Sequence, residues 1–173
     1  MKFKFTDTVG TIKEVSSHVE EDAVLIDSVV NDIVSPYSED LDNYVALIRS
    51  ALSNGEVKPT DSQLEDFCIN LSTLLYFISG RCENLGIRDD VSKAIWKEVY
   101  NKARNDGTGT VADKNSFAEL QAQKEQLTNI CYSRAYKVLK AKTEAAQELL
   151  SSCKKVLSNR MKEYELTHIS VNR

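Results

Sequence analysis

The spacing of apolar residues along the chain predicts a protein built of helices. From about Val15 to Val34, apolar side chains recur every three or four residues, as they do on one face of an amphipathic helix. Pro36 is expected to end that helix, because the residue before a proline is biased away from helical backbone angles. A second stripe, with Ser38 as its N-cap, continues to the Asn54-Gly55 pair, which has the composition of a helix end.

Two further helices are expected in the middle of the chain. The segment Thr60–Gln63 fits a capping box and begins the most hydrophobic stretch, which we predict to run towards Gly80, with Gly86 closing the element. Asp89 and Asp90 then open another helix, because acidic side chains suit the positive end of a helix dipole. The hydrophobic stretch after Gln63 is the predicted core.

The last third of the chain predicts a long helix after a loop. A Gly-rich segment near 105–110 breaks the periodic pattern, and Ser116–Tyr164 contains no Gly or Pro. We expect one helix of up to roughly 70 Å there, or two helices with a soft break. The alternation of Lys and Phe at residues 2–5 fits a short strand or a frayed arm. The predicted fold class is therefore all-α, with a helical bundle in the N-terminal half and a long C-terminal helix or helical hairpin.

Charge divides the chain into two regions. The net charge is −4, but residues 1–90 hold seven Lys/Arg and 17 Asp/Glu, whereas residues 91–173 hold 15 Lys/Arg and nine Asp/Glu. The first is an acidic helical region with a net charge of −10, and the second is a basic helical region with a net charge of +6. Such a separation suggests a polyanionic partner for the basic region.

Between Tyr132 and Lys162, eight basic residues meet only two acidic ones. A helical wheel places most of these cations opposite a broad apolar sector, so they form either a solvated face or a surface that contacts a polyanion. A second basic group precedes the Gly-rich loop, where an exposed helix end could follow a strand of nucleic acid. Together the candidate nucleic-acid contacts are Lys97, Lys102, Arg104, Arg134, Lys137, Lys140, Lys154, Lys155 and Lys162.

Four residues of this helix call for a separate explanation. Lys142 and Arg160 fall inside the apolar sector, where an unpaired buried cation is costly. They could snorkel at its edge, meet another subunit, or pair with the acidic first half of the chain. Tyr132 and Tyr136 flank Arg134 and could stack on unpaired bases or pack within the helix interface.

The sequence offers no catalytic, cofactor or metal site. Cys68, Cys82, Cys131 and Cys153 lack metal-ligand spacing, and the two histidines have no partners at ligand spacing. The GTGT loop lacks the spacing of a phosphate-binding loop, and no Ser/His/Asp or Cys/His set is present. No signal peptide or 18-residue apolar run is found, so we expect a cytoplasmic, non-enzymatic protein that does not enter a membrane.

The order of features resembles the phage recombination mediators of the UvsY type. The likeness rests on KAR at Lys102–Arg104 before a Gly/Asp-rich loop, Asp113-Lys114, Glu119, and a long helix containing LLSSC at Leu149–Cys153 with a basic tail. It covers roughly Val91 to Leu166. The resemblance implies DNA recombination as the process, contact of Lys102 and Arg104 with single-stranded DNA, a homo-oligomer, and contacts with a recombinase and a single-strand-binding protein.

Two functional interpretations follow. The first is a phage-encoded accessory protein, located in the host cytoplasm, that binds single-stranded DNA and assists recombinase loading. The alternative is a helical protein-interaction module without nucleic-acid binding, such as a phage structural component or a host-directed inhibitor.

Overall fold

The computed structural model describes the backbone of residues 5–53 and 58–171 and the side chains of residues 15–53 and 58–166. Four helices account for nearly all of these residues: α1 (Phe5–Ser53), α2 (Asp61–Asp106), α3 (Val111–Gln121) and α4 (Gln123–Val171). No strand occurs within the described ranges, so the all-α prediction is confirmed.

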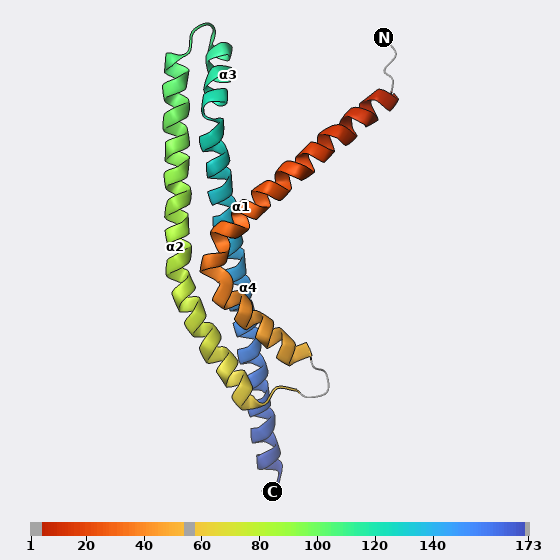
Figure 1. Cartoon of the computed structure of the whole chain (residues 1–173). Coiled ribbons are helices and arrows are strands. Elements are labelled where there is room, and N and C mark those ends of the chain that lie inside the picture. Colours follow the sequence, from red (N-terminus) through yellow and green to blue (C-terminus); the bar gives the residue numbers. More distant parts are fainter. Residues whose placement is uncertain (1–4, 54–57, 172–173) are drawn as a thin grey trace.

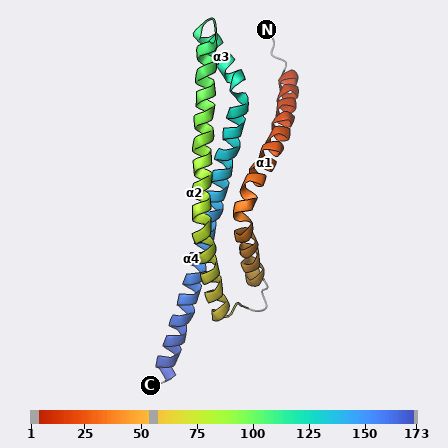
Figure 2. The same ribbon diagram turned by 60° about the vertical axis from the view of Figure 1, so that its left-hand side comes forward.

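A long antiparallel hairpin forms the frame of the molecule. α2 runs along one side, and α3 and α4 return in line with one another along the other side (Figures 1 and 2). The loop at residues 107–110 connects the two sides, and Gly109 adopts a φ of 96° there. The side chains of Ala103, Ala118 and Ala122 are buried near this end, where small residues let the two sides approach closely.

The core lies where the second half of α1 covers the other end of the hairpin. Buried side chains of α1, α2 and α4 meet there, which makes this part a three-helix bundle. The fully buried large side chains include Leu41, Ile48, Leu64, Leu71, Leu85 and Leu139. The hydrophobic stretch after Gln63 therefore supplies much of the core, as the sequence predicts.

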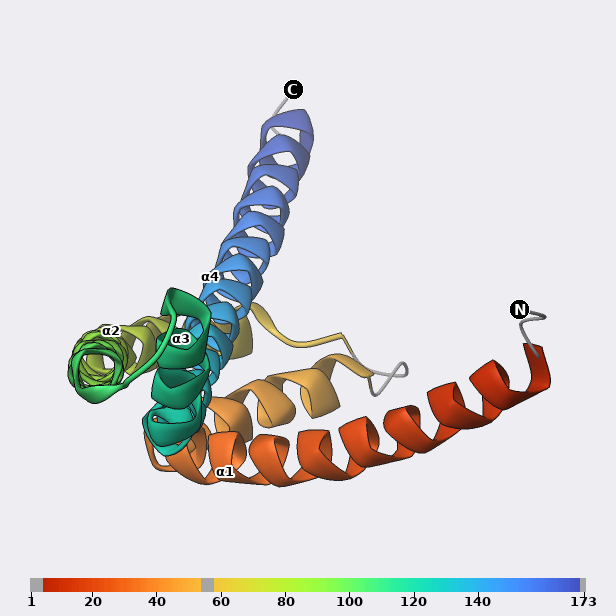
Figure 3. The same ribbon diagram turned by 90° about the horizontal axis from the view of Figure 1, so that it is seen from above.

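α1 does not end at Pro36, so the prediction of two separate helices is wrong. The helix passes through Pro36 and changes direction in its orange middle section (Figures 1 and 3). A proline inside a helix removes one hydrogen bond and costs about 3 kcal/mol. Val34 and Leu41 are buried on the two sides of Pro36, so tertiary packing offsets that cost. Ser38 is accordingly not an N-cap; its buried hydroxyl donates a hydrogen bond to Asp42 Oδ2 at 2.7 Å.

α2 is also longer than the glycines suggest. The capping box at its start is confirmed: the Gln63 N–H donates to Thr60 Oγ1 at 3.2 Å, and the Thr60 N–H donates to Gln63 Oε1 at 2.9 Å. The helix then continues through Gly80 and Gly86 without a break, so neither glycine ends it, and Asp89 opens no new helix. A side chain at Gly86 would press on the Tyr136 ring, because a Cβ there would lie 3.3 Å from Cε2.

The C-terminal part has the predicted soft break. α3 begins at Val111, earlier than the expected Ser116, because Thr110 caps it through a second capping box with Asp113. Ala122 separates α3 from α4, yet its N–H still donates to Ala118 O at 2.9 Å. The segment is thus two collinear helices, and the hairpin is formed with α2.

Two further predictions are placed by these bounds. The boundary between residues 90 and 91 falls inside α2, so the acidic and basic regions share that helix. Phe5 already belongs to α1, which excludes a strand at that residue, while the rest of the segment 2–5 lies outside the described residues.

Candidate nucleic-acid interface

The outer side of α4 carries a line of lysines. Lys137 and Lys155 are 18 residues apart and Lys162 follows seven residues later, so at about 100° per residue all three lie on one strip along the helix. All three side chains are exposed. We call Lys137, Lys155 and Lys162 the basic strip. Glu144 and Glu148 lie on the same side of α4, between Lys137 and Lys155, and are its local counter-charges.

The nine cations predicted from the sequence are all exposed, and they follow the hairpin over most of its length. Lys97, Lys102 and Arg104 belong to the part of α2 that approaches the loop, whereas Lys162 lies towards the opposite end (Figure 1). The structure therefore spreads them along the hairpin and does not gather them in one pocket. Lys102 lies about 140–160° around α2 from Lys97 and Arg104, so it is on a different side of the helix. Of the nine, only Lys140 has an ion pair within the described residues, with Glu144 of its own helix at 4.0 Å.

Lys142 turns towards α1. Its amino group lies 2.5 Å from Asp42 Oδ2 and 3.2 Å from the hydroxyl oxygen of Ser38. The Ser38 hydroxyl also donates to Asp42, so Ser38, Asp42 and Lys142 provide one another with hydrogen-bond partners beside the core.

Arg160 makes the equivalent contact at the start of α2. Its Nη1 donates to Pro59 O at 2.6 Å and to Asp61 Oδ1 at 3.0 Å. Lys142 and Arg160 thus pair with the acidic first half of the same chain. The structure therefore agrees with pairing inside one chain, which was one of the three explanations given for these cations. Neither Lys142 nor Arg160 needs a subunit interface to find an acidic partner.

Tyr132 and Tyr136 are both half-buried and pack against the hydrophobic core. The Tyr136 ring lies over Gly86 of α2, at the distance already given. Both rings therefore take part in packing between helices, and base stacking by Tyr132 or Tyr136 stays a prediction.

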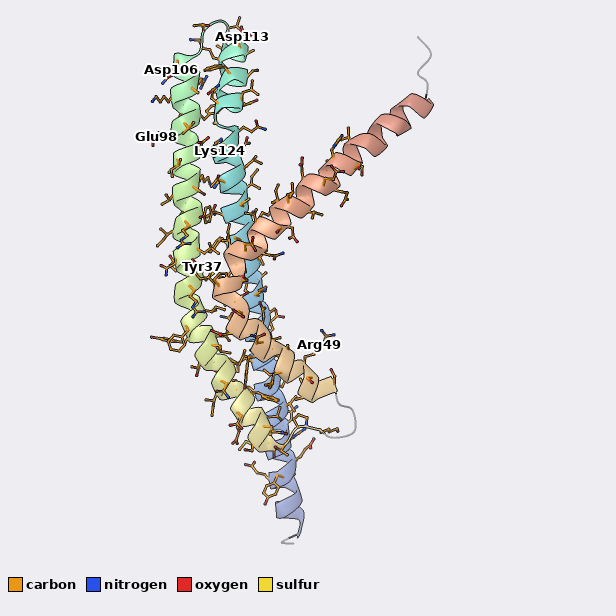
Figure 4. The ribbon with its side chains drawn as sticks, in the orientation of Figure 1. Tyr37, Arg49, Glu98, Asp106, Asp113 and Lys124 are labelled. Atoms are coloured by element: carbon orange, nitrogen blue, oxygen red, sulfur yellow. The ribbon has the colours of Figure 1, made fainter. Side chains whose placement is uncertain are left out.

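The charged residues at the ends of the hairpin show how the acidic and basic groups are spread. Asp106 and Asp113 flank the loop, and Arg49 lies on α1 towards the other end (Figure 4). Hydrogen bonds from the hydroxyl and the N–H of Thr110 lower the pKa of Asp113. This carboxylate acts as a helix cap, because it accepts the N-cap hydrogen bonds of α3.

The described residues contain no group of three or more His, Cys, Asp or Glu side chains that could hold a metal ion. Burial raises the pKa values of the Cys68, Cys82 and Cys153 thiols, which makes them poor nucleophiles. Over the same part of the chain, none of the helices is both long enough and apolar enough to cross a bilayer.

The sequence reasoning missed a second surface, which is apolar. A groove of about 320 Å³ lies between α2 and α4, beyond the part of the hairpin that α1 covers, and Ile87, Val91, Ile95 and Tyr132 supply its apolar lining. The hint in the sequence was the apolar spacing of Ile87, Val91 and Ile95, which alone does not reveal whether another helix covers it. We call this feature the groove.

The chain was compared with protein-family models, curated proteins and solved structures, and none of them matches it.

Proposed function

We propose that the protein is a non-enzymatic accessory factor that binds single-stranded DNA along the cationic side of its hairpin. The resemblance to phage recombination mediators suggests the class of strand, and it also suggests several copies acting together with a recombinase and a single-strand-binding protein in the cytoplasm. Binding in this proposal comes from Lys and Arg contacts to phosphates, which release counterions and tolerate any base sequence.

The observation that carries the proposal is the exposure of the nine cations. The acidic first half carries a net charge of −10, and it would remove the basis for binding if its carboxylates covered the basic region. In the structure only Lys142 and Arg160 of the basic region pair with described carboxylates of that half. Because these two pairs do not involve the basic strip, the strip stays open to a ligand. Lys97, Lys102 and Arg104 also stay exposed, in the part of α2 that approaches the loop.

The length of the hairpin favours an extended ligand. Lys137 and Lys155 are separated by roughly 27 Å along α4, at ~1.5 Å per residue. Phosphates of an extended strand can meet such a track one after another, whereas a compact anion can meet only one or two of its cations. Each contact between an exposed cation and a phosphate is weak, so affinity depends on their number.

Fluorescence anisotropy with a labelled oligo-dT strand, titrated at ~50 and ~200 mM salt, tests the proposal. For a single strand the logarithm of affinity falls with the logarithm of salt by about 0.7 per phosphate contacted. If all nine cations take part, a fourfold rise in salt weakens binding by several thousandfold, and four contacts would give roughly a fiftyfold loss. No binding at the lower salt would reject the proposal.

A charge-matched pair of variants locates the contacts. Lys137→Ala/Lys155→Ala should weaken binding at 50 mM salt and reduce the salt slope by about 1.4. Arg49→Ala/Lys58→Ala removes the same charge from exposed positions outside the basic region and should leave the slope unchanged. Equal effects of the two double variants would mean that total charge, and no particular surface, controls the affinity.

A second candidate function is a helical protein-interaction module. The observation in its favour is the extent of exposed apolar surface, which on proteins that act alone is rarely contiguous over large areas. This candidate predicts partner binding with no affinity for oligo-dT, so the same titration distinguishes the two.

A further inference from the structure

The first part of α1 leaves the bundle with its apolar stripe uncovered. We call residues 15–29 the arm. The stripe that buries Val30 and Val34 continues backwards at three- and four-residue spacing through Ile26 and Val19 to Val15. Ile26 is half-buried, but the side chains of Val19 and Val15 are 59% and 56% exposed. The arm therefore carries a core-type stripe with no core against it.

The hairpin has a matching uncovered surface at the same level. It consists of the groove and of exposed Leu127, which lies about 140° around α4 from Tyr132, towards the side that α1 covers further along the helix. Leu127 lies eleven residues before Val138, which places both on one side of α4. Val138 in turn lies one turn before Lys142, whose amino group contacts Asp42 of α1. The part of α1 that follows the bend thus covers this side of the hairpin. Alongside the arm, before the bend, no described residue covers it.

We infer that the arm of one copy packs into the groove of a second copy, and that the exchange is reciprocal. The apolar stripe of the arm and the groove are the two sides of one helix–helix interface. The bend at Pro36 keeps them apart within each chain (Figures 2 and 3). A two-fold pair brings each arm to its partner's groove and buries both sets of apolar residues. This inference does not depend on nucleic-acid binding.

The bend favours a second copy over the chain's own arm. Directly after Pro36, α1 is held on α2, because the Tyr37 ring packs below the Arg88 guanidinium at 5.9 Å and Arg81 Nη1 donates to Tyr37 O at 3.3 Å. Arg81 also lies 3.8 Å from a carboxylate oxygen of Asp40. These contacts fix the start of the bundle section, and the arm then points away from its own hairpin.

Charge favours the groove over a second arm as the binding surface. The arm contains Glu20, Glu21, Asp22 and Asp27 with no Lys or Arg, so two arms packed together would repel. Around the groove, the cations are Arg88, Lys102 and Lys124, and the carboxylates are Glu98, Glu125 and Asp106, which lies eleven residues after Ile95. This surface therefore has no net charge, and it repels the acidic arm less than a second arm would.

A complementation experiment on the full-length chain tests the inference. Val19→Asp impairs the arm and Ile95→Glu impairs the groove; both positions are exposed in the single chain, so folding should survive, which far-ultraviolet circular dichroism checks. Sedimentation equilibrium should give a dimer for the unchanged protein and a dissociation constant raised more than about tenfold for each variant. Mixing the two variants should give mixed dimers that are tighter than either single-variant dimer, because one of their two interfaces joins an intact arm to an intact groove and the other carries both changes.

The remaining outcomes each contradict the inference in a recognisable way. A monomeric unchanged protein would mean that the arm closes on its own groove or binds a different partner. Dissociation by Val19→Asp without any effect of Ile95→Glu would mean that arms pair with each other. A mixture that dissociates as readily as each variant alone would contradict pairing of the arm with the groove. Glu21→Gln, on the side of the arm opposite the stripe, is the control and should leave the dissociation constant nearly unchanged. None of these masses reports on oligo-dT binding, which is measured separately.

Discussion

The two glycines inside α2 allow a sharp test of the fold, because alanine should have different effects at each. At Gly80 an added Cβ would meet nothing within 4 Å, and the residue lies inside a continuous helix. Alanine loses less backbone entropy than glycine on folding and is favoured in helix interiors by about 0.5–1 kcal/mol. We therefore expect Gly80→Ala to raise the free energy of unfolding by that amount.

Gly86→Ala has the same helical advantage but a steric cost. The new Cβ would lie 3.3, 3.6 and 3.7 Å from three ring atoms of Tyr136, so the ring must shift by a few tenths of an ångström. Overpacking of this kind typically costs about 1–3 kcal/mol, so the net effect should be between zero and a loss of about 2 kcal/mol. The difference between the two variants should then be about 1–3 kcal/mol.

Urea unfolding followed by circular dichroism measures both values, with unchanged m-values as the check on two-state behaviour. In a Tyr136→Leu background the smaller, flexible side chain should relieve the contact, and Gly86→Ala should become as favourable as Gly80→Ala. A loss of about 1 kcal/mol or more in Gly80→Ala would refute the reasoning. That result would mean that Gly80 has a left-handed backbone and does not lie inside a continuous helix.

Two further predictions concern polar contacts. A double-mutant cycle with Lys142→Met and Asp42→Asn should give a coupling of about 0.5–1 kcal/mol in urea unfolding, and a coupling of zero would mean that the pair is not formed. For Asp113, hydrogen bonds from Thr110 lower the pKa in the folded state, so its stabilising contribution is present above the unfolded pKa and is lost as the pH falls through the folded pKa. The stability difference between the unchanged protein and Asp113→Asn should therefore be constant well above about pH 4 and should shrink as the pH falls below that value. A difference independent of pH would show that the Thr110 contacts do not depend on the charge.

Apolar periodicity predicted the helices well, while single Pro and Gly residues misplaced their ends. The stripes before and after Pro36 were both recognised, but local backbone preference alone implied a stop between them. Packing of Val34 and Leu41 on the hairpin outweighs that preference, and a one-dimensional pattern contains no information about it. The capping box at Thr60 was reliable because it depends only on neighbours in the sequence.

The candidate site was predictable in its residues and less so in their surroundings. The excess of cations is a property of the sequence, and so is the position of Lys142 within the apolar sector. The partner of Lys142 is 100 residues away, at Asp42, and only the fold brings the two together. The groove was missed for the same reason. An apolar stripe indicates that burial of the surface is favourable, but only the position of α1 shows that no helix of the same chain covers it.

Divergence of the arm keeps four of the 17 acidic residues of the first half away from the cations of its own hairpin. An exposed carboxylate attracts a cation appreciably only within about a Debye length, roughly 8–10 Å at moderate salt. The arm points away from its own hairpin (Figure 1). The two proposed surfaces are also compatible. Lys137 follows Tyr132 by five residues, so the basic strip lies about 140° around α4 from a residue that lines the groove. A docked arm would bring its carboxylates towards Lys102 but would leave the strip open. Assembly through the groove would therefore bring two basic strips into one complex without covering them, and joining them in this way turns weak phosphate contacts into useful affinity.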